Sequence, residues 1–308
     1  MSGSVNAQGK SAFVAIVGRP NVGKSSLLNA MLGQKVAIVS SKPQTTRTRI
    51  MGVLTRGENQ LVFLDTPGLH KPRTRLGGYM VKSVTESVAG VDACLLVTEA
   101  GRHIAPEDRE LIQKFRTQGL EAALAINKID AVKDKSVLMG QIAEFSQAFP
   151  FTAVVPVSAL QGDGVPALLD ELEKFCQPGG HLFPEDTLTD QPERVLAGEI
   201  IREKLLRLLD QEIPHGTAVL VERMREREDG SGLTDVEATI FCERESHKAM
   251  IIGKKGSMLK KVGTYARQDM ERFFGCPIYL QLWVKVKEDW RNRQNILHSL
   301  GYDKTGLE

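Results

Sequence analysis

The stretch Gly18–Ser25 reads GRPNVGKS, and it decides the fold of the first half of the chain. It fits the phosphate-binding loop pattern G-x-x-x-x-G-K-[ST] at every fixed position. An apolar run at 13–17 precedes it and a helix-like run at 24–32 follows it, which is the strand–loop–helix context that the pattern requires. The glycines let consecutive N–H groups face phosphate oxygens, and the N-terminus of the helix adds the positive end of its dipole.

Two side chains of this stretch and one nearby loop are candidates for phosphate and metal binding. Lys24 would bring a positive charge to the outer phosphates of a nucleotide, and Ser25 would offer its hydroxyl to Mg²⁺. The polar stretch QTTR at 44–47 could supply a threonine to the same ion. We expect Thr46 to be that ligand because it stands directly before the arginine, and the sequence leaves Thr45 open as the alternative.

A second phosphate signal follows an apolar run, QLVFLD at 60–65. It ends in Asp65, and Thr66, Pro67 and Gly68 come next. A carboxylate at a strand tip can hold Mg²⁺ through water, and the N–H of Gly68 can approach a terminal phosphate. The residues expected to take part in catalysis are Lys24, Thr46 and Gly68, and those expected at the metal are Ser25, Thr46 and Asp65.

Two further motifs point to a guanine base. The run at 122–126 is an apolar strand that leads into NKID at 127–130, and VSA at 157–159 ends the next strand. Asp130 is placed to accept hydrogen bonds from N1–H and the exocyclic amine of guanine, and adenine offers neither donor. Sites of this kind discriminate by roughly 10⁴-fold or more, because the wrong base leaves a polar group unpaired. Ser158 and Ala159 are suited to donating a backbone N–H to guanine O6.

Composition limits the class of protein. The 308 residues suggest two domains, and 42% hydrophobic with 25% charged residues allows both to bury a core. A net charge of +2 means that any nucleic-acid binding must come from a local patch. The four cysteines are far apart, which fits a reduced, cytoplasmic protein without zinc or disulfides. We expect no signal peptide and no membrane span, because no apolar run approaches about 18 to 20 residues.

The order of elements predicts an α/β protein with a second, α+β domain. From residue 13 to about 175 strands alternate with helical patterns, which predicts a mostly parallel sheet with helices on both faces. A Pro-, Asp- and Thr-rich stretch from 177 to 192 reads as a linker. The elements expected after it are a helix at 193–209, strands at 217–228 and 233–243, a helix at 246–252, a G-x-x-G loop, a helix to 274 and a strand at 278–286.

The G-x-x-G loop, Gly253-Lys254-Lys255-Gly256, is the second candidate site. Between residues 253 and 267 the chain has five basic residues and no acid, so it could lie against a sugar–phosphate backbone. Ile251 and Ile252 could form the floor of a groove for unstacked bases. A solvated basic helix with a turn is the alternative, but the order of elements fits an RNA-binding KH fold of the bacterial type. The expected RNA-binding residues are Ile252, Gly253, Lys254, Lys255, Gly256, Lys260 and Lys261.

The last strand carries Tyr279 and Trp283 on its polar-alternating side. They could stack on bases, but we expect them to pack under a helix or at a domain contact. A second basic cluster follows and is diluted by acids, so we rank it below the G-x-x-G loop as an RNA contact. Its basic residues are Lys285, Lys287, Arg291 and Arg293.

With GRPNVGKS, QTTR, DTPG, NKID, VSA and then a G-x-x-G module, the chain resembles the Era family of bacterial ribosome-assembly GTPases from about residue 12 to 302. The sequences HLFPED and LWVKVK add to the resemblance. It implies a slow, GTP-hydrolysing switch that uses GTP, GDP and Mg²⁺, and that binds 16S ribosomal RNA near its 3′ end while the 30S subunit matures. It also implies, for some members, association with the cytoplasmic side of the inner membrane. We expect a monomer.

The resemblance also implies where the domains and the nucleotide site lie. The expected segments are a flexible N-terminus at 1–11, a P-loop GTPase domain at 12–176, a linker at 177–192, a type II KH domain at 193–290 and a C-terminal tail at 291–308. The expected nucleotide-binding residues are Gly18, Asn21, Val22, Gly23, Lys24, Ser25, Ser26, Asp65, Thr66, Pro67, Gly68, Asn127, Lys128, Asp130, Ser158 and Ala159.

Two positions bear on the rate of hydrolysis. Many GTPases place a glutamine after the glycine of the D-x-x-G signal to orient the attacking water. This chain has Leu69 there, which cannot form that hydrogen bond, so we expect slow intrinsic hydrolysis. Asn21 matches the position that binds K⁺ in some relatives, and a role in stabilising the loop is the alternative.

Two other function classes compete with this one. The first is a membrane-associated cell-cycle scaffold whose KH module binds protein, which we disfavour because lipidation signals and a basic amphipathic membrane helix are missing. The second is a metabolic kinase, which we disfavour because NKID and VSA have no use in ATP chemistry. The RNA sequence, the activating partner and the order of GTP and RNA binding stay open.

Overall fold

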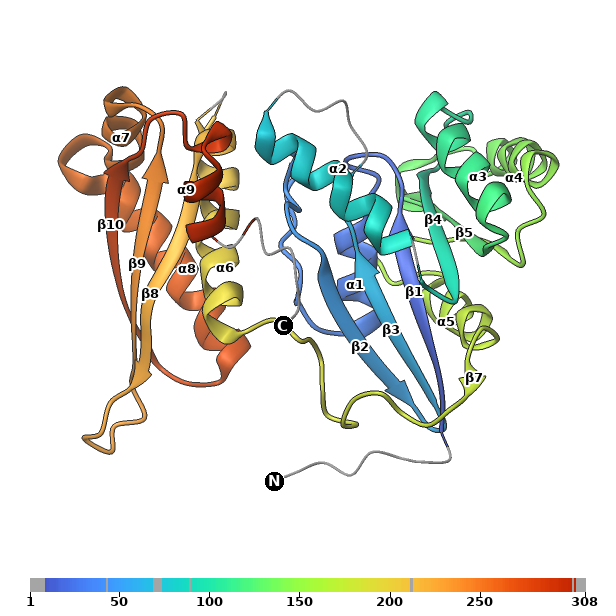
Figure 1. The fold of residues 1–308 in the computed structure, drawn as a ribbon, viewed down its shortest axis with the longest axis horizontal. Helices are drawn as coiled ribbons and strands as arrows, with labels where there is room; N and C mark the ends of the chain where they lie inside the picture. Colours follow the sequence, from blue (N-terminus) through green and yellow to red (C-terminus); the bar gives the residue numbers. More distant parts are fainter. Residues whose placement is uncertain are drawn as a thin grey trace. The chain divides into compact units, whose positions relative to one another are not determined.

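The computed structural model describes residues 9–42, 44–68, 74–88, 90–210, 213–300 and 302, without the side chains of 81, 84, 85 and 88. The described residues form two compact units (Figure 1). The first unit holds the chain up to Ala37, from Thr46 to residue 68 and from Met80 to Asp190. The second unit holds Ile38–Thr45, residues 74–79 and the chain from Gln191 onward.

The first unit is built on a mixed sheet in the order β2-β3-β1-β4-β5-β6. Of the strands on this path, β2 runs antiparallel to β3 and the others are parallel to their neighbours. The short β7 pairs antiparallel with β1. The strands are β1 (Lys10–Val17), β2 (Ile50–Arg56), β3 (Asn59–Asp65), β4 (Ala93–Glu99), β5 (Glu121–Asn127), β6 (Val154–Pro156) and β7 (Gln177–Pro178).

Helices cover both faces of this sheet, as the nearly continuous burial along β3, β4 and β5 requires. Ala15 and Val17 on β1 pack with Phe115 and Phe145 in one core cluster, so α3 and α4 cover that face. On the other face α1 and α5 contact each other and β3. The helices before residue 190 are α1 (Lys24–Leu32), α2 (Arg75–Val88), α3 (Pro106–Gln118), α4 (Ser136–Ala148), α5 (Val165–Glu173) and the short η1 (Ile129–Ala131).

The second unit has a sheet in the order β10-β9-β8, with β9 antiparallel to β8 and parallel to β10. Alternate residues of β9, such as Val236 and Ile240, are fully buried with α6, α7 and α8 in one core cluster. The elements are α6 (Glu193–Leu208), η2 (Pro214–Gly216), β8 (Ala218–Glu226), β9 (Thr234–Cys242), α7 (Glu245–Ile252), η3 (Lys254–Gly256), α8 (Ser257–Phe274), β10 (Ile278–Val286), η4 (Trp290–Asn292) and α9 (Gln294–Ser299). Both predicted fold classes are confirmed.

The structure contradicts part of three predicted segments: the flexible N-terminus, the linker and the C-terminal tail. Lys10 and Ser11 belong to β1 rather than to a flexible end, and residues 1–8 lie outside the described part. The expected linker is hydrogen-bonded to the first unit as far as Thr189, whose hydroxyl donates to Met51 O at 2.6 Å. A proline-rich composition does not reveal such pairing, because the partners are more than a hundred residues away in the sequence.

The expected C-terminal tail contains the end of η4 and all of α9. Trp290, directly before it, is fully buried and donates from Nε1 to Gly216 O at 2.9 Å. The ring of Tyr302 stacks on Trp290 with centroids 6.0 Å apart. Tyr302, which we had assigned to a tail, therefore packs against the KH unit. In the part of the chain that the structure describes, no helix combines the length and apolar character needed to cross a membrane.

Candidate nucleotide and nucleic-acid sites

The phosphate-binding stretch lies between the end of β1 and the start of α1. Gly18 has φ +146°, and a Cβ there would lie 2.3 Å from Val97 O. Gly23 has φ +97°, and a Cβ there would lie 2.3 Å from Asn127 Nδ2. Side chains at either position would therefore collide with fixed neighbours. Gly23 also leaves the N-terminus of α1 without a side-chain cap, so its first N–H groups can meet an anion.

Lys24 is a buried cation inside this loop. Its Nζ donates to Gly18 O at 3.0 Å and to Arg19 O at 2.9 Å. Burial lowers the pKa of Lys24 to about 8, and the nearby carboxylates of Asp65 and Asp108 oppose that shift. A phosphate group would supply the negative charge that favours the protonated amine. The position of Lys24 thus suits an anionic ligand.

Three oxygen side chains meet beside Lys24. Asp65 Oδ2 accepts a hydrogen bond from Ser25 Oγ at 2.6 Å, and Ser25 Oγ lies 2.9 Å from Thr46 Oγ1. Asp65 is fully buried, and among the described residues its Oδ1 has no hydrogen-bond partner. Burial raises the pKa of Asp65 to about 6, with Lys24 opposing. A hard divalent cation would offset the cost of burying this carboxylate, so the donor set fits Mg²⁺.

Thr45 does not join this cluster. Its hydroxyl donates to Lys42 O at 2.6 Å, within the 38–45 segment of the second unit. Of the two candidate threonines, Thr46 is therefore the one whose hydroxyl contacts Ser25.

Residues 66–68 lie close to the phosphate loop. The hydroxyl of Thr66 is fully buried and donates to Ile16 O at 2.8 Å. A Cβ on Gly68 would lie 2.7 Å from both N and Cα of Pro20, so only glycine lets the two main chains approach this closely. Leu69, which we expected to slow hydrolysis, lies outside the described residues.

Asn127 joins the candidate base site to the phosphate loop. Its Nδ2 donates to Val22 O at 2.9 Å, and its Oδ1 accepts from Lys128 N at 2.8 Å and Ala159 N at 3.0 Å. Asp130 is exposed, and its Oδ1 accepts from Ser158 Oγ at 2.6 Å. The structure thus brings the NKID and VSA motifs together, as predicted. The N–H of Ala159 is already engaged by Asn127, so guanine O6 would have to share or replace that bond.

The structure shows one ion pair in this region that sequence reasoning missed. Arg19 Nε lies 3.1 Å from Oδ2 of Asp108, which is fully buried. Burial raises the pKa of Asp108, and Arg19 opposes that shift. Oδ2 of Asp108 also accepts from Ala105 N at 3.2 Å at the start of α3. In the sequence, Asp108 is only an acidic residue in the first turn of a predicted helix, and such residues normally indicate helix capping.

The G-x-x-G loop lies between α7 and α8. Gly253 has φ +73°, and a Cβ there would lie 2.7 Å from Met258 Cβ. Lys255 has φ +51°, so the loop turns sharply while Lys254 and Lys255 remain exposed. The loop therefore presents backbone and two cations to solvent.

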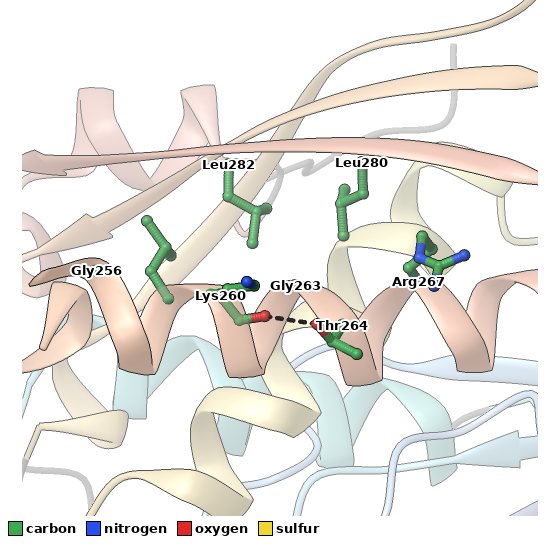
Figure 2. A pocket seen from close by; sticks show the side chains of 8 residues that line it. Gly256, Lys260, Gly263, Thr264, Arg267, Leu280 and Leu282 are labelled. Carbon is green, nitrogen blue, oxygen red and sulfur yellow. Dashed lines mark hydrogen bonds between the residues drawn. The ribbon is translucent and has the colours of Figure 1, made fainter.

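A groove of about 360 Å³ begins at this loop and runs between α8 and β10 (Figure 2). Leu280 and Leu282 point from β10 toward α8, while Lys260, Thr264 and Arg267 line the helix side. The groove combines an apolar strand wall with a basic rim. Its lining residues are Gly256, Leu259, Lys260, Gly263, Thr264, Arg267, Leu280 and Leu282.

The structure contradicts one sequence expectation for this site. Ile251 is fully buried in the core of the unit, so it cannot form the floor of a groove. Ile252 and Lys261 are not among the residues that line the groove, and their contact with RNA stays a prediction. Lys261 is exposed, and its Nζ is 6.0 Å from the ring centre of Tyr265. Lys260, Lys254 and Lys255 are exposed along the expected surface.

The two aromatic residues of β10 are not packed under a helix. Tyr279 is 48% and Trp283 42% exposed, and the guanidinium of Arg227 lies 5.3 Å from the ring centre of Tyr279. Our expectation of packing beneath a helix is wrong, because Leu280 and Leu282 occupy the helix-facing positions of the strand.

The second basic cluster is largely engaged within its own unit. Lys287 Nζ lies 4.3 Å from the ring centre of Phe241. Arg291 pairs with Glu243 at 2.6 Å, and Lys285 Nζ lies 3.8 Å from Glu222 Oε1. These contacts support its lower rank as an RNA surface.

Comparisons with known proteins agree with this geometry. A family model described as a 50S ribosome-binding GTPase matches residues 13–128, and a KH domain model matches residues 212–291. The chain is 50% identical over 294 residues to GTPase Era of Ruminiclostridium cellulolyticum, covering 95% of this chain and 97% of the relative. It is 49% identical to GTPase Era of Clostridioides difficile, covering 96% and 99%.

Two solved structures share the whole fold. A Tyr-to-Ala variant of Aquifex aeolicus Era bound to GDP·AlF₄⁻ has a TM-score of 0.91, with 41% identity, 95% of this chain covered and 99% of that chain. A structure of Era in complex with MgGDPNP and nucleotides 1506–1542 of 16S ribosomal RNA also has a TM-score of 0.91, with 40% identity and coverage of 96% and 99%. These matches span both units, so the chain belongs to the GTPase Era family.

Proposed function

We propose that this GTPase is a slow GTP-driven switch that binds the 3′ region of 16S ribosomal RNA and assists assembly of the small ribosomal subunit. The observation that carries the proposal is that one chain joins a phosphate-and-guanine site to a KH groove with an apolar wall and a basic rim. The Era relative whose structure holds both MgGDPNP and a 16S RNA segment supports it.

In the nucleotide site, the chain's own groups would bind and orient GTP. The N-terminus of α1, the loop N–H groups and Lys24 would hold the phosphates, and Gly68 would approach the γ-phosphate. Ser25, Thr46 and Asp65 would hold Mg²⁺, which neutralises charge on the transferring phosphate when bound. Asp130 would accept hydrogen bonds from guanine, with Ser158 fixing its carboxylate.

Asn21 is the proposed ligand for K⁺. It has φ +63°, a left-handed conformation that asparagine adopts more readily than most residues. Both the K⁺ role and a purely loop-stabilising role are compatible with that backbone.

In the KH unit, the groove would hold unstacked bases against Leu280 and Leu282, and Lys254, Lys255, Lys260 and Arg267 would meet phosphates. The test is binding of the full chain to an RNA that ends with the 3′ segment of 16S ribosomal RNA. A matched RNA with the single-stranded part scrambled is the control. We expect tight binding to the first and weak, salt-sensitive binding to the second. Equal binding to both RNAs would contradict the assignment.

The competing scaffold function is not favoured, because the relatives and the groove chemistry point to RNA. We propose that the chain works as a cytoplasmic monomer on the 30S subunit. Peripheral membrane association has no supporting feature among the described residues.

A further inference from the structure

Asp108 lies in the first turn of α3 and is fully buried, whereas the neighbouring acid of the same turn, Glu107, is exposed. An aspartate is almost never buried to this degree unless its charge is paired. The charge of Asp108 faces Arg19 of the phosphate-binding stretch, whose Nε lies 3.1 Å from Oδ2. Capping of a helix does not require the carboxylate to be buried, so the position of Asp108 calls for another explanation.

The ion pair between Asp108 and Arg19 is incompletely satisfied. Among the described residues, Asp108 Oδ1 and Arg19 Nε are buried without a hydrogen-bond partner, so the attraction between the two side chains is mainly electrostatic. Asp108 Oδ2 also accepts from Ala105 N at 3.2 Å. Buried polar groups without a partner are uncommon in native proteins, and a buried ion pair is weak evidence for stability. Both observations favour a role in the neighbouring phosphate site.

Helix α3 is a fixed support for this contact. Its Leu111 and Phe115 are fully buried in the core cluster that also holds Ala15 and Val17 of β1. Protein cores are close-packed, so elements that share one core have little freedom to move against each other. The start of α3 therefore presents its carboxylate at a fixed position relative to the end of β1.

The main chain at Arg19 holds the amine of the phosphate loop. Lys24 Nζ donates to Arg19 O at 2.9 Å and to Gly18 O at 3.0 Å. Gly18 has no side chain that could fix this part of the loop, whereas the guanidinium of Arg19 is tied to α3. A displacement of Arg19 would therefore displace the amine that meets the phosphates.

We propose that Asp108 is a positioning residue for the outer phosphates of GTP and GDP, because it holds Arg19 and thereby directs the amine of Lys24. Asn127 has the corresponding role at the other end of the loop, where it donates to Val22 O. The proposal rests on the proposed nucleotide site, to which it adds a residue that acts through Arg19.

The test is a double-mutant cycle in the full chain. The variants are Asp108→Asn, Arg19→Gln and the two changes together, and Glu107→Gln is the matched control at an exposed acid of the same turn. Asp108→Asn keeps a side-chain oxygen that can accept from Ala105 N, so it retains the cap and removes the charge. Affinities for GDP, IDP and GMP are measured by competition with fluorescent GDP. Thermal unfolding confirms that each variant is folded.

We expect GDP affinity to fall about tenfold in Asp108→Asn, in Arg19→Gln and in the double variant alike, because partners of one contact are not additive. The ratio of GDP to GMP affinity should fall with it, since GMP lacks the outer phosphate that Lys24 meets. The ratio of GDP to IDP affinity should stay at the wild-type value, because these two differ only in the base. Glu107→Gln should bind GDP as the wild-type chain does.

Wild-type GDP affinity in folded Asp108→Asn and Arg19→Gln would overturn the positioning role. Losses that add up in the double variant, or that are equal for GDP and GMP, would overturn it too. If Asp108→Asn does not fold, Arg19→Gln decides, and a wild-type ratio of GDP to GMP affinity in that variant contradicts the proposal. Failure of the wild-type chain to bind GDP at all would instead overturn the proposed nucleotide site.

Discussion

Asn127 Nδ2 donates a 2.9 Å hydrogen bond to the carbonyl of Val22, so the loop after β5 is fastened to the phosphate loop after β1. The same side chain accepts the N–H of Ala159 at 3.0 Å. One buried amide therefore sets the spacing between the phosphate and base parts of the site. Gly23 is required for this contact, because a Cβ there would lie 2.3 Å from Nδ2.

Replacing Asn127 with alanine should weaken nucleotide binding without changing base preference. The change removes the bonds to Val22 and Ala159, and a lost buried hydrogen bond costs about 1 to 3 kcal/mol, or roughly 5- to 150-fold in affinity. Binding of fluorescent GDP and GTP would be measured, with IDP and XDP as base controls. An unchanged GDP affinity would show that Asn127 does not organise the site.

Asp130→Asn should exchange guanine for xanthine preference, because the amide matches the carbonyl of xanthine where guanine has an amine. A site that leaves a polar group unpaired discriminates by about 10⁴-fold. Hydrolysis of GTP and XTP by wild type and variant would be compared. Unchanged preference for GTP in the variant would reject the role of Asp130 in base recognition.

Thr46→Ala should reduce Mg²⁺-dependent GTP hydrolysis far more than Thr45→Ala. Only Thr46 places its hydroxyl beside Ser25, while the hydroxyl of Thr45 donates to Lys42 O. Single-turnover rates would be measured across a range of Mg²⁺ concentrations, and we expect at least a tenfold loss for Thr46→Ala, about 1.4 kcal/mol. A larger loss for Thr45→Ala would reverse the assignment.

Replacing Na⁺ with K⁺ should raise the hydrolysis rate if Asn21 binds a monovalent ion. The added charge would stand where negative charge builds up between the leaving and transferring phosphates. Rates in the two salts would be compared at equal ionic strength, and Asn21→Ala should remove the difference. Equal rates in the wild-type chain would leave Asn21 as a structural residue.

Changing Lys254 and Lys255 to aspartate should weaken RNA binding and flatten its salt dependence. Both lysines are exposed at the G-x-x-G loop. Each lost phosphate contact with a single strand lowers the slope by about 0.7. Charge reversal should cost more affinity than the matched Gly-Gly variant, and GTP hydrolysis without RNA should barely change. If RNA affinity and its salt dependence are both retained, RNA binds to another surface of the protein.

The nucleotide motifs could be found from sequence because each is short and lies directly after a strand. Gly18 follows β1 and Asp65 ends its parallel neighbour β3, so their positions at one sheet edge follow from strand direction alone. Sequence alone does not decide whether Thr45 or Thr46 brings its hydroxyl to Ser25, because the two residues are identical and adjacent. Only the folded path of the 38–45 segment places one hydroxyl at Ser25.

The groove between α8 and β10 shows where local sequence pattern stops being informative. Ile251 and Ile252 stand next to the G-x-x-G loop, yet Leu280 and Leu282 form the groove wall because β10 pairs with β9 in a register that turns them toward α8.

By itself, the sequence determined the two domain folds, the guanine-nucleotide chemistry and the basic loop, because glycine geometry, strand periodicity and charge are local properties. The tertiary structure alone decided which threonine meets Ser25, which apolar residues face the groove, and that Arg202, Glu203 and Lys204 are buried. The reason is physical: each of these features depends on contacts between residues far apart in the sequence, such as Lys204 with Asp269, and a buried charge must be paired.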